Sequence, residues 1–172
     1  MPIVPETKSW TWVLERRCPE CGFDASAIEY RDVPAMTREN ADAWMPVLER
    51  ADVSARPDDS TWSPLEYAAH VRDVYDVMAG RLRLLLEQDD PAFENWDQDA
   101  TAIAGRYGEQ DPAAVADELH TRAYALADAW AAVPDSALGR SGRRSDGSVF
   151  TVESLARYFI HDPVHHLWDV RG

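Results

Sequence analysis

The sequence has little positive charge and no long hydrophobic run. Only 17 of its 172 residues are lysine or arginine, and the formal net charge is -14. A chain this acidic repels phosphate backbones and anionic lipid headgroups, so neither nucleic acid nor a membrane is an expected partner. No apolar stretch approaches the roughly 20 residues of a membrane span, and the first residues lack the basic and apolar regions of a signal peptide. We therefore expect a cytoplasmic protein.

Cysteines and catalytic loop motifs are also scarce. The two cysteines, Cys18 and Cys21, form one Cys-x-x-Cys pair, which excludes a secreted disulfide scaffold. A glycine-rich phosphate loop, a nucleophile elbow and an H-E-x-x-H motif are all missing, so the reactions that depend on them lack their parts. What is present is a globular composition, 45% hydrophobic and 28% charged, in a chain long enough for one domain with a full core.

Apolar residues recur at helical spacing in four segments. The predicted helices run from Thr37 to Ala51, Ser63 to Glu87, Asp111 to Val133, and Thr151 into the C-terminal histidines. Two of them open with a cap residue followed by proline, and Thr37 is the expected cap of the first helix. These helices predict an all-α four-helix bundle over residues 37–172. Residues 1–36 are expected to form an irregular extension packed on the bundle.

Three histidines suggest a metal site. His161 and His165 are four residues apart in the last predicted helix, so both rings lie on one face. His70 lies in the middle of the second helix. Three neutral imidazoles from two helices would make an open metal site with one position left for water or substrate. His166 lies about 100° around the helix from His165, and we expect it to point elsewhere.

Two carboxylates accompany these histidines. Asp73 follows His70 by one helical turn, and Asp162 lies beside both histidines of the last helix. Either could orient a ligand imidazole through a hydrogen bond, as metal-bound histidines usually require. The alternative is a solvated or ion-paired carboxylate.

The segment Cys18-Pro19-Glu20-Cys21-Gly22 has the form of one knuckle of a rubredoxin-type or zinc-ribbon site. A second knuckle is missing, so three interpretations stay open. The thiolates could hold a zinc with ligands from elsewhere, form a redox-active pair, or be inert buried thiols. A structural zinc or inert thiols are favoured over redox chemistry, because no thioredoxin-like βαβ pattern surrounds the motif.

Three further residues are candidate substrate contacts. Trp96 lies in the mostly polar connection 91–110 and could close over a metal pocket or plug the end of the bundle. Arg143 and Arg144 belong to a basic cluster in a predicted tight turn before the last helix. They could receive a carboxylate or phosphate of a substrate, or they could be solvated.

The motifs together resemble the DinB-like superfamily over residues 37–170. They are Trp62-Ser63-Pro64-Leu65-Glu66 leading to His70-Val71-Arg72-Asp73, then Trp96-Asp97-Gln98-Asp99, then Phe150-Thr151-Val152-Glu153 leading to His161-Asp162-x-x-His165. The resemblance implies an up-down-down-up bundle and a divalent metal held by His70, His161 and His165. It also implies thiol-dependent chemistry, since characterised relatives include mycothiol-dependent maleylpyruvate isomerase and S-transferases that use bacillithiol or mycothiol.

The expected function is that of a small metalloenzyme acting on a small-molecule substrate. Zn²⁺ or Ni²⁺ would activate a thiol such as mycothiol for S-transfer or isomerisation, or activate water for hydrolysis. The alternative is a non-catalytic metal-binding or stress-associated protein, in which the ion only ties two helices together. A closed site with a fourth protein ligand would favour the alternative, and an open site would favour the enzyme. A homodimer is also left open.

Overall fold

The computed structural model describes residues 3–5 and 9–171 of the chain. Four long helices form its body: α1 (Val33–Leu48), α2 (Pro64–Glu87), α4 (Pro112–Ala131) and α5 (Val152–Arg171). The shorter elements are the 3-10 turns η1 (Thr11–Leu14), η2 (Tyr30–Asp32), η3 (Tyr107–Glu109) and η4 (Asp135–Ala137), the helix α3 (Gln98–Ala104), and the strands β1 (Ala92–Phe93), β2 (Ser141–Arg144) and β3 (Val149–Thr151).

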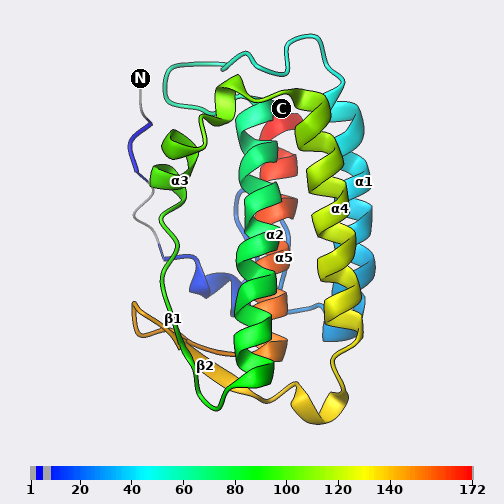
Figure 1. The fold of residues 1–172 in the computed structure, drawn as a ribbon, viewed down its shortest axis with the longest axis vertical. Coiled ribbons are helices and arrows are strands. Elements are labelled where there is room, and N and C mark those ends of the chain that lie inside the picture. Colours follow the sequence, from blue (N-terminus) through cyan, green and yellow to red (C-terminus); the bar gives the residue numbers. More distant parts are fainter. Residues whose placement is uncertain (1–2, 6–8, 172) are drawn as a thin grey trace.

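The long helices form the expected four-helix bundle. In Figure 1, α1 runs upward, α2 and α4 run downward, and α5 runs upward beside α2. Helices α1 and α2 each pack chiefly against α4 and α5, and much less against each other. The connections are therefore up-down-down-up, and α5 lies alongside α2. The bundle predicted from the sequence is confirmed.

Helix α2 begins at the position that the sequence indicates. The Glu66 backbone N–H donates to Ser63 Oγ at 3.2 Å, and the Ser63 backbone N–H donates to Glu66 Oε2 at 2.8 Å. This reciprocal capping box satisfies two backbone donors that would otherwise lack a partner at the helix start. Because His70 follows Glu66 by one turn, the cap also fixes the position of His70 along the bundle.

Helix α1 begins one turn earlier than predicted. It starts at Val33, with Pro34 in its first turn. Proline is favoured there because the backbone N–H that it lacks would have no partner within the helix. Thr37 lies inside the helix, and its hydroxyl donates to the Val33 carbonyl at 2.7 Å. The helix ends at Leu48, also earlier than predicted. The sequence expectation took Thr37 as the cap and overlooked the proline that starts the helix.

A small sheet covers the lower end of the bundle in Figure 1. Strand β1 pairs in parallel with β2, and β2 pairs antiparallel with β3, with Gly142 opposite Phe150. The β2–β3 turn contains Gly147 at φ +90°, a conformation that glycine adopts without strain. The tight turn was predicted from Asp146-Gly147. The connection 91–110, described from the sequence only as mostly polar, contains β1, α3 and η3.

Aromatic side chains form the centre of the core. Trp130 stacks on Phe159 with ring centroids 6.1 Å apart, and Tyr75 meets Phe159 edge-on at 5.9 Å. Helix α5 is buried along much of its length, and its buried residues include Val152, Leu155, Ala156, Phe159, Ile160 and Leu167. Such packing fixes the rotation of α5 about its axis, and this rotation decides where its C-terminal histidines point.

The N-terminal extension lies against α5 and α1. Val13 is buried, and η1 and η2 both contact α5. Arg157 of α5 donates through Nε to the Ala25 carbonyl and through Nη2 to the Ser26 carbonyl, both at 3.2 Å. The hydroxyl of Tyr30 donates to the Trp130 carbonyl at 2.6 Å. The extension is thus held to the bundle by backbone carbonyl contacts as well as by apolar packing.

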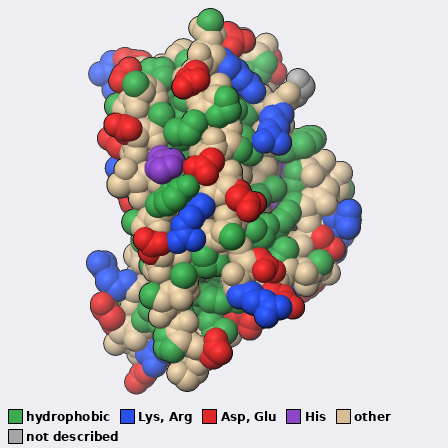
Figure 2. Space-filling model, turned by 90° about the vertical axis from the view of Figure 1, so that its right-hand side faces the viewer, with side chains coloured by type: hydrophobic (Ala, Val, Ile, Leu, Met, Phe, Trp, Pro, Cys, Tyr) green, Lys and Arg blue, Asp and Glu red, His purple; other side chains and the backbone are tan. Residues whose placement is uncertain are grey.

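The surface carries mixed charge. Figure 2 shows acidic and basic side chains interspersed with apolar ones over one face of the molecule. Among the described residues, none of the helices combines the length and apolar character required to cross a bilayer.

Candidate metal centres

Helix α5 carries two pairs of ligand-type side chains, each pair spaced by four residues. One pair is His161 and His165, and the other is Asp162 and His166. Residues four apart lie on one helix face, whereas adjacent residues are about 100° apart around the axis. The two pairs therefore point in different directions, one toward the N-terminal extension and one toward α2.

The first group, here called the open cluster, consists of His70, Asp162 and His166, with ligand atoms within 4.8 Å of one another. His70 Nε2 lies 3.3 Å from Asp162 Oδ1 and 3.4 Å from Oδ2, and His166 Nε2 lies 3.8 Å from Oδ2. These separations exceed the usual N–H···O range. They are close to the distance of about 3.3 Å that separates two ligand atoms of a tetrahedral metal ion when each metal–ligand bond is about 2.0–2.1 Å long. The donor set, two imidazoles and one carboxylate, fits a divalent ion.

Neighbouring groups fix both imidazoles of the open cluster. The buried ring of His70 stacks on Trp96, with centroids 5.3 Å apart and planes at 11°, and meets Trp62 at 5.5 Å. His166 Nδ1 donates to Asp169 Oδ2 at 2.9 Å. With Nδ1 engaged by Asp169, Nε2 is the nitrogen of His166 that faces Asp162. Carboxylate-oriented imidazoles of this kind are typical of metal ligands.

The side chains of the open cluster differ in their exposure to solvent. His70 is fully buried, but the side chains of His166 and Asp162 are 18% and 32% exposed. Burial opposes ionisation of Asp162, yet the neighbouring His70 and His166 outweigh it and hold the pKa of this carboxyl below its usual range. Burial likewise disfavours the charged form of His166, but Asp162 and Asp169 raise its pKa above the ordinary histidine value.

The second group, here called the cysteine cluster, consists of Cys18, Cys21, His161 and His165. Cys18 Sγ lies 3.6 Å from His165 Nδ1, and Cys21 Sγ lies 3.7 Å from His161 Nε2. Burial raises the pKa of the Cys21 thiol to about 11. Burial, together with His165, lowers the pKa of His161 to about 4. Without an ion these two groups are therefore neutral at physiological pH.

The three histidines predicted to converge lie in two different clusters. His70 belongs to the open cluster, whereas His161 and His165 belong to the cysteine cluster. The places beside His70 are taken by His166, which the sequence analysis set aside, and by Asp162, whose carboxylate lies 3.3 Å from His70 Nε2. The missed signal is Asp162-x-x-x-His166, which has the same four-residue spacing as the histidine pair.

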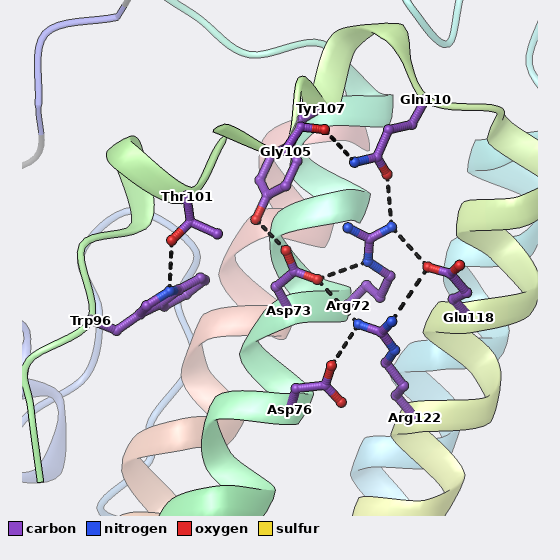
Figure 3. Close-up of polar contacts among 10 residues, drawn as sticks. All are labelled: Arg72, Asp73, Asp76, Trp96, Thr101, Gly105, Tyr107, Gln110, Glu118 and Arg122. Carbon is purple, nitrogen blue, oxygen red and sulfur yellow. Dashed lines mark hydrogen bonds and ion pairs between the residues drawn. The ribbon is translucent and has the colours of Figure 1, made fainter. Parts of the chain in front are cut away.

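Asp73 belongs to a network between α2, η3 and α4. It accepts hydrogen bonds from Arg72 Nε at 2.8 Å, from the Tyr107 hydroxyl at 2.5 Å and from Arg122 Nη1 at 3.2 Å. Figure 3 shows both arginines converging on Glu118 of α4 as well. Asp73 thus links α2 to η3 and α4. The sequence analysis did not anticipate the roles of Tyr107 and Arg122.

Trp96 lies beside the open cluster, where its ring stacks on that of His70. Its Nε1 donates to Thr101 Oγ1 at 2.9 Å (Figure 3). It also lines a groove of about 890 Å³ bordered by α2, β1 and α3. Trp96 therefore connects His70 to a surface groove.

Arg143 and Arg144 are engaged with the protein. Buried Arg144 donates to Asp146 at 2.7 Å and to the Tyr158 hydroxyl at 3.2 Å, and Arg143 pairs with Asp90 at 3.4 Å. Both arginines belong to β2. Among the described residues, other side chains line the groove beside Trp96. These contacts give both arginines a structural role in the sheet.

The fold and the open cluster define a class of protein: an up-down-down-up helical bundle with ligand-type side chains meeting between its second and last long helices. The chain belongs to the DinB superfamily, whose family profile matches residues 35–170. The family assignment made from the sequence motifs is thereby confirmed.

A similar solved structure is that of YfiT from Bacillus subtilis, described as a probable metal-dependent hydrolase with an unusual four-helix bundle topology. The two proteins share 17% sequence identity with a TM-score of 0.64, over 97% of this chain and 90% of that chain. At this identity the likeness demonstrates a shared fold. Comparison with curated proteins finds no match.

Proposed function

We propose that this protein is a divalent-metal-dependent enzyme whose metal is held by His70, Asp162 and His166. The observation that carries the proposal is the open cluster itself: three ligand atoms within 4.8 Å of one another, with two of the three side chains partly exposed. Three protein ligands leave a coordination position for water or substrate. The non-catalytic alternative needs a fourth protein ligand at this cluster, and the described residues supply none there.

The surrounding residues prepare the cluster for such a role. Trp96 and Trp62 restrict rotation of the His70 ring and direct Nε2 toward Asp162. Asp169 holds the proton of His166 on Nδ1 and leaves Nε2 free to bind. A divalent ion bound there would lower the pKa of a bound water or thiol, so that hydroxide or thiolate forms near neutral pH.

Two nucleophiles fit the open position. Water would give hydrolysis, the activity suggested for YfiT by its description. A low-molecular-weight thiol such as mycothiol would give S-transfer or isomerisation, which resemblance to the thiol-dependent members of the superfamily supports. Zn²⁺ and Ni²⁺ both suit imidazole ligands. The small-molecule substrate would approach along the groove that Trp96 lines beside His70. The catalytic unit would be the bundle, which begins at Val33, and the preceding residues would form an extension packed on it.

Metal binding tests the ligand assignment. The His166→Ala variant should lose one equivalent of divalent metal after equilibrium dialysis, measured by elemental analysis, with affinity at least 10-fold weaker. The matched control is His120→Ala, which removes an exposed imidazole paired with Asp42 on α1 and should leave the metal content unchanged. Equal metal content in the two variants would refute the open cluster as a metal centre.

Activity tests the reaction. Wild-type protein loaded with Zn²⁺ or Ni²⁺ should turn over either activated esters and amides, or simple electrophiles in the presence of a mycothiol-like thiol. His166→Ala should abolish the observed turnover, and His120→Ala should retain it. Full metal loading with no turnover in either assay would favour the non-catalytic alternative.

A further inference from the structure

We infer that Cys18, Cys21, His161 and His165 bind a second metal ion, a tetrahedrally coordinated zinc that fastens the N-terminal extension to α5. This site shares no ligand with the open cluster. The inference therefore stands whether or not the proposed enzymatic function does.

The separations between ligand atoms fit a tetrahedral zinc. With Zn–S bonds of about 2.3 Å and Zn–N bonds of about 2.0–2.1 Å, the sulfur–nitrogen edge of a tetrahedron is about 3.6 Å. Cys18 Sγ and His165 Nδ1 are 3.6 Å apart, and Cys21 Sγ and His161 Nε2 are 3.7 Å apart. The four side chains come from segments about 140 residues apart in sequence, yet their ligand atoms all lie within 4.8 Å of one another.

The backbone around the cysteines forms a tight knuckle. The Gly22 N–H donates to the Cys18 carbonyl at 3.0 Å, and the Cys18 N–H donates to the Phe23 carbonyl at 2.8 Å. Gly22 has φ +76°, a left-handed conformation that favours glycine because a side chain there would be strained. These contacts turn the chain sharply and present both sulfurs to the same pair of histidines.

The surroundings orient and cover the cluster. His165 directs Nδ1 toward Cys18 and places Nε2 3.2 Å from Glu20 Oε2, so this carboxylate fixes the tautomer that leaves Nδ1 free to bind. The Trp10 ring lies 5.6 Å from His161 and 5.4 Å from His165, measured between ring centroids. Cys18 is fully buried. The cluster is therefore largely shielded from water.

The donor set favours structural zinc. Two thiolates and two imidazoles complete four-coordination, so no position is left for water or substrate. The two thiolate charges balance the divalent ion, and the buried centre is then neutral overall, which avoids an uncompensated charge in a region of low dielectric constant. Binding replaces two thiol protons with one ion and requires no oxidant or reductant.

Cobalt substitution tests the site on the wild-type chain. Metal-free protein titrated with Co²⁺ should develop thiolate-to-cobalt charge-transfer bands together with the intense visible bands of tetrahedral cobalt. Modification of the two thiols with a mercurial should release one zinc ion per two thiols, detected with a chromogenic chelator. Absence of the thiolate bands, or complete thiol modification without zinc release, would overturn the inference.

A set of variants separates the two centres. His161→Ala should lose the thiolate bands and one metal equivalent, whereas His120→Ala should keep both. His166→Ala should keep the thiolate bands while losing the metal of the open cluster. If circular dichroism shows that His161→Ala does not fold, the cobalt and mercurial measurements on the wild-type protein still test the zinc site. A cobalt affinity and thiolate spectrum in folded His161→Ala identical to those of wild type would exclude His161 as a ligand.

Discussion

At the scale of single residues, a step of one position along α5 decides which cluster a side chain joins. His161 and His165 face the cysteines, whereas Asp162 and His166 face His70. Asp169 lies between the two groups, 2.9 Å from His166 Nδ1 and 3.8 Å from His165 Nε2. Both groups use the same four-residue spacing, so their assignment depends on the rotation of α5 and not on the motif.

Glu66 is a second residue whose role is visible only in its contacts. Its carboxylate accepts from Arg56 Nε at 2.9 Å and from the Ser63 backbone N–H at 2.8 Å. Burial by itself would raise the pKa of Glu66, but Arg56 and Ser63 outweigh it and lower the pKa below the usual glutamate value. Because the folded pKa is lowered, this stabilisation is present above the unfolded pKa of about 4.3 and is lost as the pH falls through the folded pKa.

We therefore predict that Glu66→Gln lowers the free energy of unfolding by about 1–3 kcal/mol near pH 7. The difference from wild type should shrink at an acidic pH, below the unfolded pKa of about 4.3, as the pH falls through the lowered folded pKa of the carboxyl. Urea unfolding at the two pH values measures both quantities. Glu87→Gln, at the exposed C-terminal end of the same helix, should change stability by less than about 0.5 kcal/mol. A pH-independent difference for Glu66→Gln would contradict the role of the charge.

At the scale of elements, α2 is fixed at both ends. The capping box holds its start, and Arg140 holds its end by donating to the Leu85 carbonyl at 2.6 Å and to the Gln88 carbonyl at 2.7 Å. Such contacts satisfy the carbonyls that a helix leaves without intrahelical partners at its C-terminus. Arg140 precedes β2, so the small sheet and the end of α2 are locked together. His70 therefore lies on a helix that has little freedom to shift along its axis.

The contact between β2 and α2 leaves no room at Gly142. A Cβ added there would lie 2.7 Å from Leu85 Cδ2 and 2.8 Å from the Pro91 carbonyl oxygen. We predict that Gly142→Ala destabilises the fold by about 1–3 kcal/mol, the usual cost of overpacking. Gly139→Ala is the matched control, since a Cβ there meets no atom within 4 Å among the described residues. Thermal unfolding of both variants measures the difference. Equal unfolding midpoints for the two variants would show that β2 shifts to accommodate the added methyl group at low cost.

At the scale of the whole molecule, the N-terminal extension completes the bundle. It supplies Cys18 and Cys21 to one face of α5, while α2 supplies His70 to the adjacent face. Helix α5 is thus held on two sides near its C-terminal end. An ion in the cysteine cluster would bind the folded arrangement and not the unfolded chain, which adds about 2.7 kcal/mol at an ion concentration 100 times the dissociation constant.

We predict that chelation of the bound zinc loosens the extension before it unfolds the bundle. Hydrogen exchange should accelerate at least 10-fold over residues 9–28 and remain slow in the buried centres of α2 and α4. Mass spectrometry of peptic fragments, with and without a chelator, measures this difference. The His161→Ala variant should show fast exchange over the same residues even with metal present. Unchanged exchange in chelated wild-type protein would mean that apolar packing alone holds the extension.

The four-helix bundle and the family could be predicted from the chain alone, because helical periodicity, the capping residues and the motifs around His70 and His161 are local signals. It also indicated a metal-type site near the C-terminal histidines and a zinc knuckle that lacked partners. Pro34 is a local signal for the start of α1 that the prediction overlooked. Local signals could not show that residues 91–110 contribute a strand to the small sheet and a short helix that packs against α2.

Which histidine meets which partner depends on how the helices pack in the folded protein. The packing of Phe159 and its neighbours fixes the rotation of α5, and this rotation directs Asp162 and His166 to His70 and directs His161 and His165 to the cysteines. Spacing along a sequence specifies that two side chains share a helix face. The direction of that face depends on the apolar contacts of the whole helix, which form only when the chain has folded.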